Sequence, residues 1–344
     1  MHMADALLSP AVGLAADAVS VAAIAVSVAR VKKDEFSEKK VPIMGVAGAL
    51  VFAGQMINFA IPGTGSSGHI GGGILLAGLL GGVPAFLSIV AVLAIQCLFF
   101  ADGGLLALGC NIFNLGVIPC LLIYPLIFKP LIRRGTGVAR LSAASVISAI
   151  AALVLGAFCV VIQTSLSGIA GLPFGTFTAL MLPIHLVIGV IEGLVTAAVL
   201  CFIHNMRPEL IPTSASGGKL SGVSVKKTII ALAALVIIFG GVFSLIASNA
   251  PDGLEWAIGK TKEQTLGAEE ESGAEGGIID KAAEIQETTV ILPDYAFASD
   301  PENAAGAPAS GLVGAAITFA LAGAVGFLIS FLKKRKRTAA KADA

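Results

Sequence analysis

Long apolar segments alternate with short polar ones along almost the whole chain. Most of the apolar runs reach the roughly 20 residues that a helix needs to cross about 30 Å of hydrocarbon. The run at 68–81 is short and, taken alone, could be a re-entrant segment. The pattern predicts an all-α, polytopic transmembrane helical bundle. The nine runs lie at about 11–29, 41–59, 68–81, 83–100, 104–128, 141–163, 180–203, 228–248 and 310–332.

The lysines and arginines indicate how many runs cross the membrane. If 68–81 crosses, all of the 22 basic residues except Lys260, Lys262 and Lys281 fall on one side. If it does not cross, the basic groups split between the two sides. Because cytoplasmic loops carry the excess of basic residues, the pattern favours nine spans, with the N-terminus outside and the C-terminus inside.

The first run could be mistaken for a signal peptide. No basic residue precedes it, and its basic cluster, which starts at Arg30, comes after it. A signal peptide has the opposite charge layout. We therefore expect the N-terminus to be retained.

The composition and the missing motifs exclude several classes of protein. Hydrophobic residues make up 56% of the chain and charged residues only 13%, too few for a soluble surface. The cysteines lie in or beside apolar runs without a CxxC pair, which indicates small core or lipid-facing residues. The chain contains neither a GxxxxGK[ST] loop for ATP nor an HExxH pair for metalloenzyme chemistry.

The first two residues form a potential metal chelate. Met1 offers its α-amine, and His2 offers its backbone nitrogen and Nδ1, which together close a five-membered and a six-membered ring. Deprotonation of a backbone amide needs a strongly polarising ion that accepts nitrogen donors in a plane. Ni(II) and Cu(II) suit this best, and Co(II) is compatible. A fourth donor would complete the plane.

His69 is the histidine best placed to be that donor. It follows a Gly-rich segment, 62–68, which the predicted topology places on the same side as the N-terminus. His204 falls at the inner end of the seventh span, and His185, near its outer end, is a weaker candidate for a nearby polar contact. A lone histidine in such a loop is also common as a turn residue, so spacing alone leaves the site open.

Two stretches resemble signatures of a known family. The opening MHMADALLSP, Met1 to Pro10, resembles the MHI-x-[DE]-G-x-L-S/P pattern of the CbiM/NikM proteins. The stretch from Gln55 to Gly72 resembles their NFPVPGGTSGHLLGG signature. These proteins are the substrate-binding membrane components of energy-coupling-factor transporters for cobalt and nickel. Ala4 and Ala6 depart from the family pattern, which bears on the first turn and not on the ligands.

The C-terminal part resembles a second module. The segment 251–256, PDGLEW, resembles the PDGLE signature, and 292–297 fits the rest of a module with two spans around an outer loop, like the small CbiN/NikN subunits. The strongly acidic loop is expected to be partly disordered. The predicted parts are a metal-binding membrane domain (1–210), a cytoplasmic linker (211–227), the two-span module (228–332) with its outer loop (249–309), and a basic cytoplasmic tail (333–344).

The resemblance implies a site built from the Met1 amine, His2 and His69, which match the family positions. It also implies a nickel or cobalt importer in a prokaryotic plasma membrane, driven by a transmembrane coupling subunit and two cytoplasmic ATPases. The ion is cargo, no cofactor or nucleic acid is expected, and membrane lipid surrounds the protein. The alternative is a stand-alone secondary metal transporter or channel, against which the few intramembrane charges argue mildly.

A metal-bound histidine usually donates its other ring nitrogen to an acceptor, which orients the ring. Asp5, Asn58, Ser66 and Ser67 are candidates for this role on the same side, and Asp5 is equally suited to capping the first helix. Polar residues inside the spans are expected to form interhelical hydrogen bonds or to line the ion path. These residues are Asp17, Gln55, Gln96, Asn111, Asn114 and Glu192.

Overall fold

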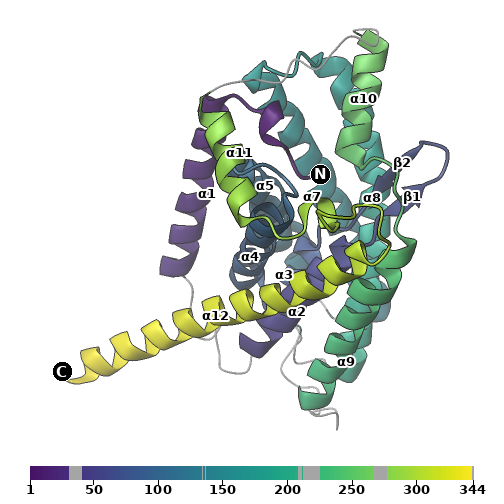
Figure 1. Cartoon of the computed structure of the whole chain (residues 1–344). Coiled ribbons are helices and arrows are strands. Elements are labelled where there is room, and N and C mark those ends of the chain that lie inside the picture. The colour runs from purple at the N-terminus through teal and green to yellow at the C-terminus, as the bar shows by residue number, and fades with distance from the viewer. Residues whose placement is uncertain are drawn as a thin grey trace.

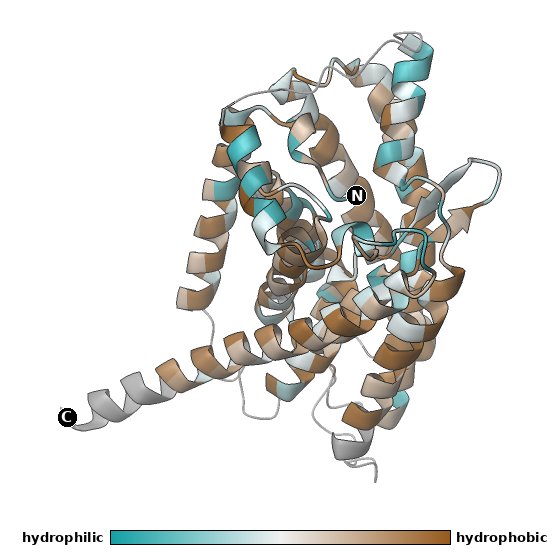
Figure 2. Ribbon diagram, viewed as in Figure 1, coloured by the Kyte–Doolittle hydropathy of each residue, from teal (hydrophilic) through white to brown (hydrophobic). Residues whose placement is uncertain are grey.

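The protein folds as a helical bundle with one small β-hairpin (Figure 1). The computed structural model describes residues 1–30, 41–133, 135, 137–207, 211, 225–265 and 277–342. Among these residues, seven helical stretches are long and apolar enough to cross a membrane. Figure 2 shows hydrophobic residues along the long helices and hydrophilic ones on the helices α10 and α11. The all-α, multi-pass prediction is confirmed.

The predicted runs correspond to helices in chain order. The run at 104–128 becomes one helical stretch whose central part, which contains Pro119 and Pro125, is wound as a π-helix. Proline lacks the N–H that an α-helical turn needs, so irregular winding is expected there. The bounds are α1 (Pro10–Arg30), α2 (Val41–Gln55), α3 (Gly73–Leu80), α4 (Gly82–Phe100), α5 (Leu108–Ile112), η3 (Phe113–Phe128), α6 (Lys129–Ile132), α7 (Val138–Ser167) and α8 (Phe174–Met206).

Two of the predicted spans are shorter as helices than the apolar runs suggest. α2 has 15 residues and α3 only eight. α3 lies between Gly72 and Gly81, which have φ values of 76° and 88°. This left-handed backbone favours glycine and ends a helix at both positions. The rest of the run before α3 is the strand β2 (Ser66–Gly68) and a buried extended segment.

The segment 68–81 nevertheless carries the chain from one end of α4 to the other. His69 lies at the end where α4 stops, because its ring stacks on His2, which in turn contacts Asp102 just after α4. Gly81, at the far end of the segment, immediately precedes the start of α4. A helix of 19 residues is about 28 Å long. The short run therefore traverses most of the bundle, as the nine-span pattern requires.

The C-terminal module packs against the first domain through its last helix. It comprises α9 (Val225–Ile237), η5 (Ile238–Val242), η6 (Phe243–Ile246), α10 (Gly253–Thr265), α11 (Ile278–Thr289), η7 (Pro293–Tyr295) and α12 (Gly306–Ala342). α12 lies along α2, where Gly48 allows close approach to Thr318 and Ala322. Such small residues let helix backbones approach closely in a bilayer.

Two helices of the predicted outer loop, α10 and α11, lie at the same end of the molecule (Figure 1). The Thr289 hydroxyl donates to the Leu98 carbonyl at 2.7 Å, and the Ile291 N–H donates to the Phe99 carbonyl at 2.9 Å. These contacts tie the loop to the end of α4. The Glu269–Glu271 stretch and most of the predicted linker lie outside the described residues.

The intramembrane polar residues bond between segments, as expected. Asp17 accepts the Gly109 N–H at 2.8 Å, and the Gln96 side chain donates to Gln55 Oε1 at 2.9 Å. Asn114 donates to Gln163 Oε1 at 2.8 Å. Each bond satisfies a polar group that lipid could not.

Candidate metal centre

The chain's first residues are buried at one end of the bundle. Met1 is 5% exposed and Met3 is fully buried. The Met3 N–H donates to Asn111 Oδ1 at 2.8 Å, and Asn111 Nδ2 donates back to the Met3 carbonyl at 3.2 Å. The Gly104 N–H also donates to that carbonyl, at 2.9 Å. This anchor fixes the backbone immediately after the predicted chelate.

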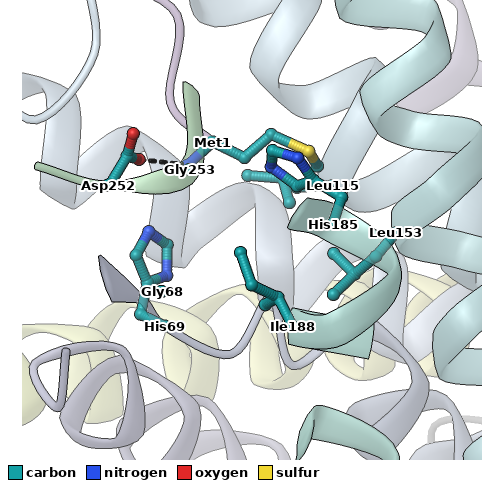
Figure 3. A pocket seen from close by; sticks show the side chains of 10 residues that line it. Met1, Gly68, His69, Leu115, Leu153, His185, Ile188, Asp252 and Gly253 are labelled. Atoms are coloured by element: carbon teal, nitrogen blue, oxygen red, sulfur yellow. Dashed lines mark hydrogen bonds and ion pairs between the residues drawn. The ribbon is translucent and has the colours of Figure 1, made fainter. Parts of the chain in front are cut away.

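The Met1 amine lies against the PDGLE segment. It donates to Asp252 Oδ2 at 2.6 Å, and Asp252 is partly buried (Figure 3). Oδ1 of Asp252 accepts the N–H groups of Leu254 and Glu255 at 2.8 and 2.9 Å, and Glu255 Oε2 accepts the Asp252 N–H at 3.1 Å. This is a capping box at the start of α10. One carboxylate therefore begins a helix and holds the chain's first amine.

His2 is held by a carboxylate from the other side. Its Nδ1 lies 3.0 Å from Asp102 Oδ1, and the Tyr295 hydroxyl donates a short hydrogen bond to Oδ2 of the same carboxylate. Tyr295 also stacks on Phe100, with ring centroids 5.1 Å apart. Burial alone would raise the pKa of Asp102, but His2 and Tyr295 outweigh it and hold the pKa well below its usual range. His2 Nε2 is buried and has no hydrogen-bond partner in the described part of the chain.

His69 lies beside His2, as the sequence predicted. The two imidazole rings stack with centroids 5.3 Å apart and planes within 7°. His69 Nδ1 lies 3.1 Å from the Ile70 carbonyl oxygen, which can only accept, so Nδ1 carries the proton and Nε2 has a lone pair. With its lone pair free, Nε2 can act as a metal ligand.

The backbone just after His69 is held by side chains of two membrane helices. Glu192 Oε2 and Oε1 accept the N–H groups of Gly71 and Gly72 at 2.7 and 3.0 Å. On the other side, Gln55 Nε2 donates to the Gly71 carbonyl at 3.0 Å. Glu192 is 3% exposed. These bonds satisfy the polar groups of an extended segment that is surrounded by apolar side chains.

Of the four residues predicted to orient the histidines, none contacts an imidazole in the described structure. Asp5 accepts the Ala107 N–H at 2.8 Å, so it neither caps the first helix nor reaches His2. Asn58 accepts the Ser248 N–H through its backbone, and Ser66 bonds to the Ser67 carbonyl. Ser67 donates to the Ala250 carbonyl at 2.7 Å. Nearness in sequence was a poor guide because the loops turn these side chains toward other segments.

Asp102 and Asp252 hold two of the candidate donors themselves, and sequence reasoning assigned neither of them a role. Both come from distant parts of the chain, 100 and 251 positions away from the residues they hold. For Asp102 there was a signal, an acidic residue in a short turn on the predicted outer side. For Asp252 the signal was its place in the PDGLE segment. Burial opposes its ionisation, but the Met1 amine and His69 hold its pKa well below the usual range.

The site combines nitrogen donors with negative charge. The amine, the His2 nitrogens and His69 are candidate ligands, while Asp102 and Asp252 supply two carboxylates beside them. Metal binding would displace protons from the nitrogens, and the carboxylates would then balance the charge of the cation. Among the described residues, no cluster of three or more His, Cys, Asp or Glu side chains could hold a metal. The Met1 amine and the His2 backbone nitrogen, which are candidate ligands, do not belong to these side chains.

The remaining histidines have different positions. His185 lines a small pocket together with Met1, His69 and Asp252 (Figure 3). His204 lies 19 residues further along α8, near its other end, which matches the expectation that it is remote.

Fold and site together define a multi-pass membrane protein that presents nitrogen donors at one end of its bundle. The family model described as "Cobalt uptake substrate-specific transmembrane region" (CbiM) matches residues 2–210, and the PDGLE domain model matches 226–331. The chain belongs to the CbiM family of cobalt-uptake transmembrane proteins, with a PDGLE domain fused behind it. The family and its relatives are transport proteins, not enzymes.

Relatives share this organisation. A protein of Archaeoglobus fulgidus, provisionally named a fused nickel transport protein, NikMN, is 33% identical over 83% of this chain and 85% of its own length. The fused nickel transport protein NikMN of Rhodobacter capsulatus is 28% identical over 93% and 95% of the two chains. The crystal structure of a truncated transition metal transporter aligns with a TM-score of 0.52 at 28% identity, over 60% of this chain and 99% of that one.

Proposed function

We propose that this protein is the substrate-capture membrane subunit of an ATP-driven nickel or cobalt importer. The observation that carries the proposal is the convergence of the Met1 amine, His2 and His69 at one end of the bundle. The ion binds through the amine, the backbone nitrogen and Nδ1 of His2, and His69. When the metal binds, His2 Nδ1 leaves Asp102 and the Met1 amine leaves Asp252. Both nitrogens then coordinate the ion.

The donor set is compatible with both nickel and cobalt, since both accept nitrogen ligands. A chain without an ATP-binding loop needs partners for active uptake. These are a transmembrane coupling subunit and two cytoplasmic ATPases. The positive-inside pattern supports an N-terminus outside and a C-terminus inside a prokaryotic plasma membrane.

The binding site is tested by one substitution. His2→Gln keeps the Met1 amine and the backbone nitrogen but removes Nδ1, so Ni(II) and Co(II) affinity of the purified protein should collapse. His204→Gln, near the other end of α8, is the matched control, because it removes an imidazole that is remote from the site. Equal affinity of the two variants would refute the chelate.

The energy source is tested by uptake in cells. We expect metal accumulation only when the coupling subunit and both ATPases are co-expressed. Accumulation in their absence would favour the stand-alone transporter instead. Orientation is tested separately, since a membrane-impermeant amine reagent should label Met1 in intact cells.

A further inference from the structure

His185 is a buried imidazole with an unused nitrogen beside the capture site. It is 1% exposed, on the face of α8 that meets the pocket lined by Met1, His69 and Asp252. Figure 3 shows its ring on the side of Met1 opposite Asp252. Gly253, next to Asp252, approaches the ring so closely that a Cβ there would lie 3.1 Å from His185 Cε1. The histidine therefore belongs to the wall of the metal pocket.

The hydrogen bonds of His185 determine which nitrogen is available. Nδ1 lies 2.8 Å from the Met181 carbonyl, one helical turn back, and a carbonyl can only accept. Nδ1 therefore carries the proton and Nε2 the lone pair. Nε2 is buried and has no hydrogen-bond partner among the described residues. A buried nitrogen in this state loses its hydration without compensation and is open to a ligand.

We propose that His185 is a relay ligand, which shares the metal ion with His69 after the ion leaves the N-terminal chelate. This proposal rests on the proposed capture function. In the described structure the His69 ring stacks on His2. In the relay step it turns from His2 toward His185, across the pocket that both line.

The tightness of the N-terminal chelate is the reason for a second metal position at His185. A chelate that includes a deprotonated backbone amide binds Ni(II) or Co(II) tightly, so the ion leaves it slowly. Two neutral imidazoles bind more weakly and need no amide deprotonation. Because His69 can belong to both sets, the ion is never without a protein ligand. The remaining pocket wall is apolar, with Leu115, Leu153 and Ile188.

The test removes Nε2 and keeps the fold. In His185→Asn the side-chain amide can still donate to the Met181 carbonyl, as Nδ1 does, but the second ring nitrogen is gone. His204→Asn, on the same helix, is the control. His185→Asn should slow uptake by the complete transporter more than it weakens equilibrium Co(II) binding, whereas the control should change neither.

The relay site is probed directly in His2→Gln, which lacks the chelating imidazole. We expect that variant to retain weak Co(II) binding, seen in the visible absorption of the bound ion, and the added substitution His185→Asn to abolish it. No residual binding, or residual binding indifferent to His185, overturns the relay. So does an affinity loss in His185→Asn alone as large as that of His69→Ala, which would make His185 a capture ligand. Failure of the capture proposal is distinct, because His2→Gln would then leave tight binding intact.

Discussion

The two halves of the metal site are held in different ways. His69 is held by the CbiM-family domain through Glu192 and Gln55, which bond to the backbone just after it. Ser67, two residues before His69, bonds to the Ala250 and Pro251 carbonyls of the PDGLE module. Met1 and His2 depend on the PDGLE module, directly through Asp252 and indirectly through Tyr295 and Asp102. The His69 segment is therefore held from both the membrane core and the outer loop, whereas the amine and the His2 ring are held by carboxylates that the outer loop supplies or orients.

The difference teaches that the fused module is part of the site and not an appendage. In the proposed capture step the amine and the His2 ring leave their carboxylate partners to bind the metal. Both carboxylates, Asp252 and Asp102, are partly buried at one end of the bundle. The His69 backbone keeps its buried bonds throughout. Four variants test this division, from the largest expected effect to the smallest.

Glu192→Ala should be the most damaging. It leaves two buried N–H groups, those of Gly71 and Gly72, without an acceptor, at a cost of about 3 kcal/mol in unfolding free energy. Thermal unfolding in detergent measures this, and metal affinity should fall with it because His69 is no longer positioned. Glu192→Gln restores one acceptor and should recover about half of the loss. Wild-type stability of Glu192→Ala would show that the segment is held by other contacts.

Tyr295→Phe should cost about 2 kcal/mol, the range for a hydrogen bond to a charged group. The ring still stacks on Phe100, so packing is preserved and only the bond to Asp102 is lost. Unfolding of this variant compared with Asp102→Asn and the double variant would reveal coupling. Additive losses would mean that Tyr295 and Asp102 do not act together.

Asp252→Asn separates the helix cap from the ion pair. Asparagine caps a helix about as well as aspartate, so stability should change by less than about 0.5 kcal/mol, whereas Asp252→Ala should lose about 1 kcal/mol. Both variants remove the carboxylate from the Met1 amine, which should react faster with an amine-acylating reagent. Unchanged labelling in both would contradict the clamp.

Lys260→Ala should have the smallest effect. Lys260 donates to Glu263 at 2.6 Å on the exposed side of α10, and both side chains are largely open to solvent. Exposed pairs of this kind contribute about 0–1 kcal/mol. Stability and metal affinity should both match the wild type, which makes this variant the control for perturbing α10 itself.

The sequence predicted the helices well where the signal is local. Hydropathy located the spans within a few residues at most ends, and the charge pattern favoured a crossing at 68–81 although its helix is only eight residues long. It gave no sign of the two docked helices that the described part of the outer loop forms. Their stability comes from contacts such as Gln286 with the Cys97 and Gly103 carbonyls, which local composition does not encode.

The sequence by itself determined the spacing of the proposed donors, because covalent bonds between the Met1 amine, the His2 backbone and the His2 ring fix the sizes of the rings that a chelate would have. It also determined that the chain crosses a membrane several times, because hydrocarbon thickness imposes a length on every span. Only the tertiary structure decided what surrounds the donors. Asp252 reaches the amine, Asp102 reaches His2 and His185 reaches the pocket because distant helices end or pass at the same place.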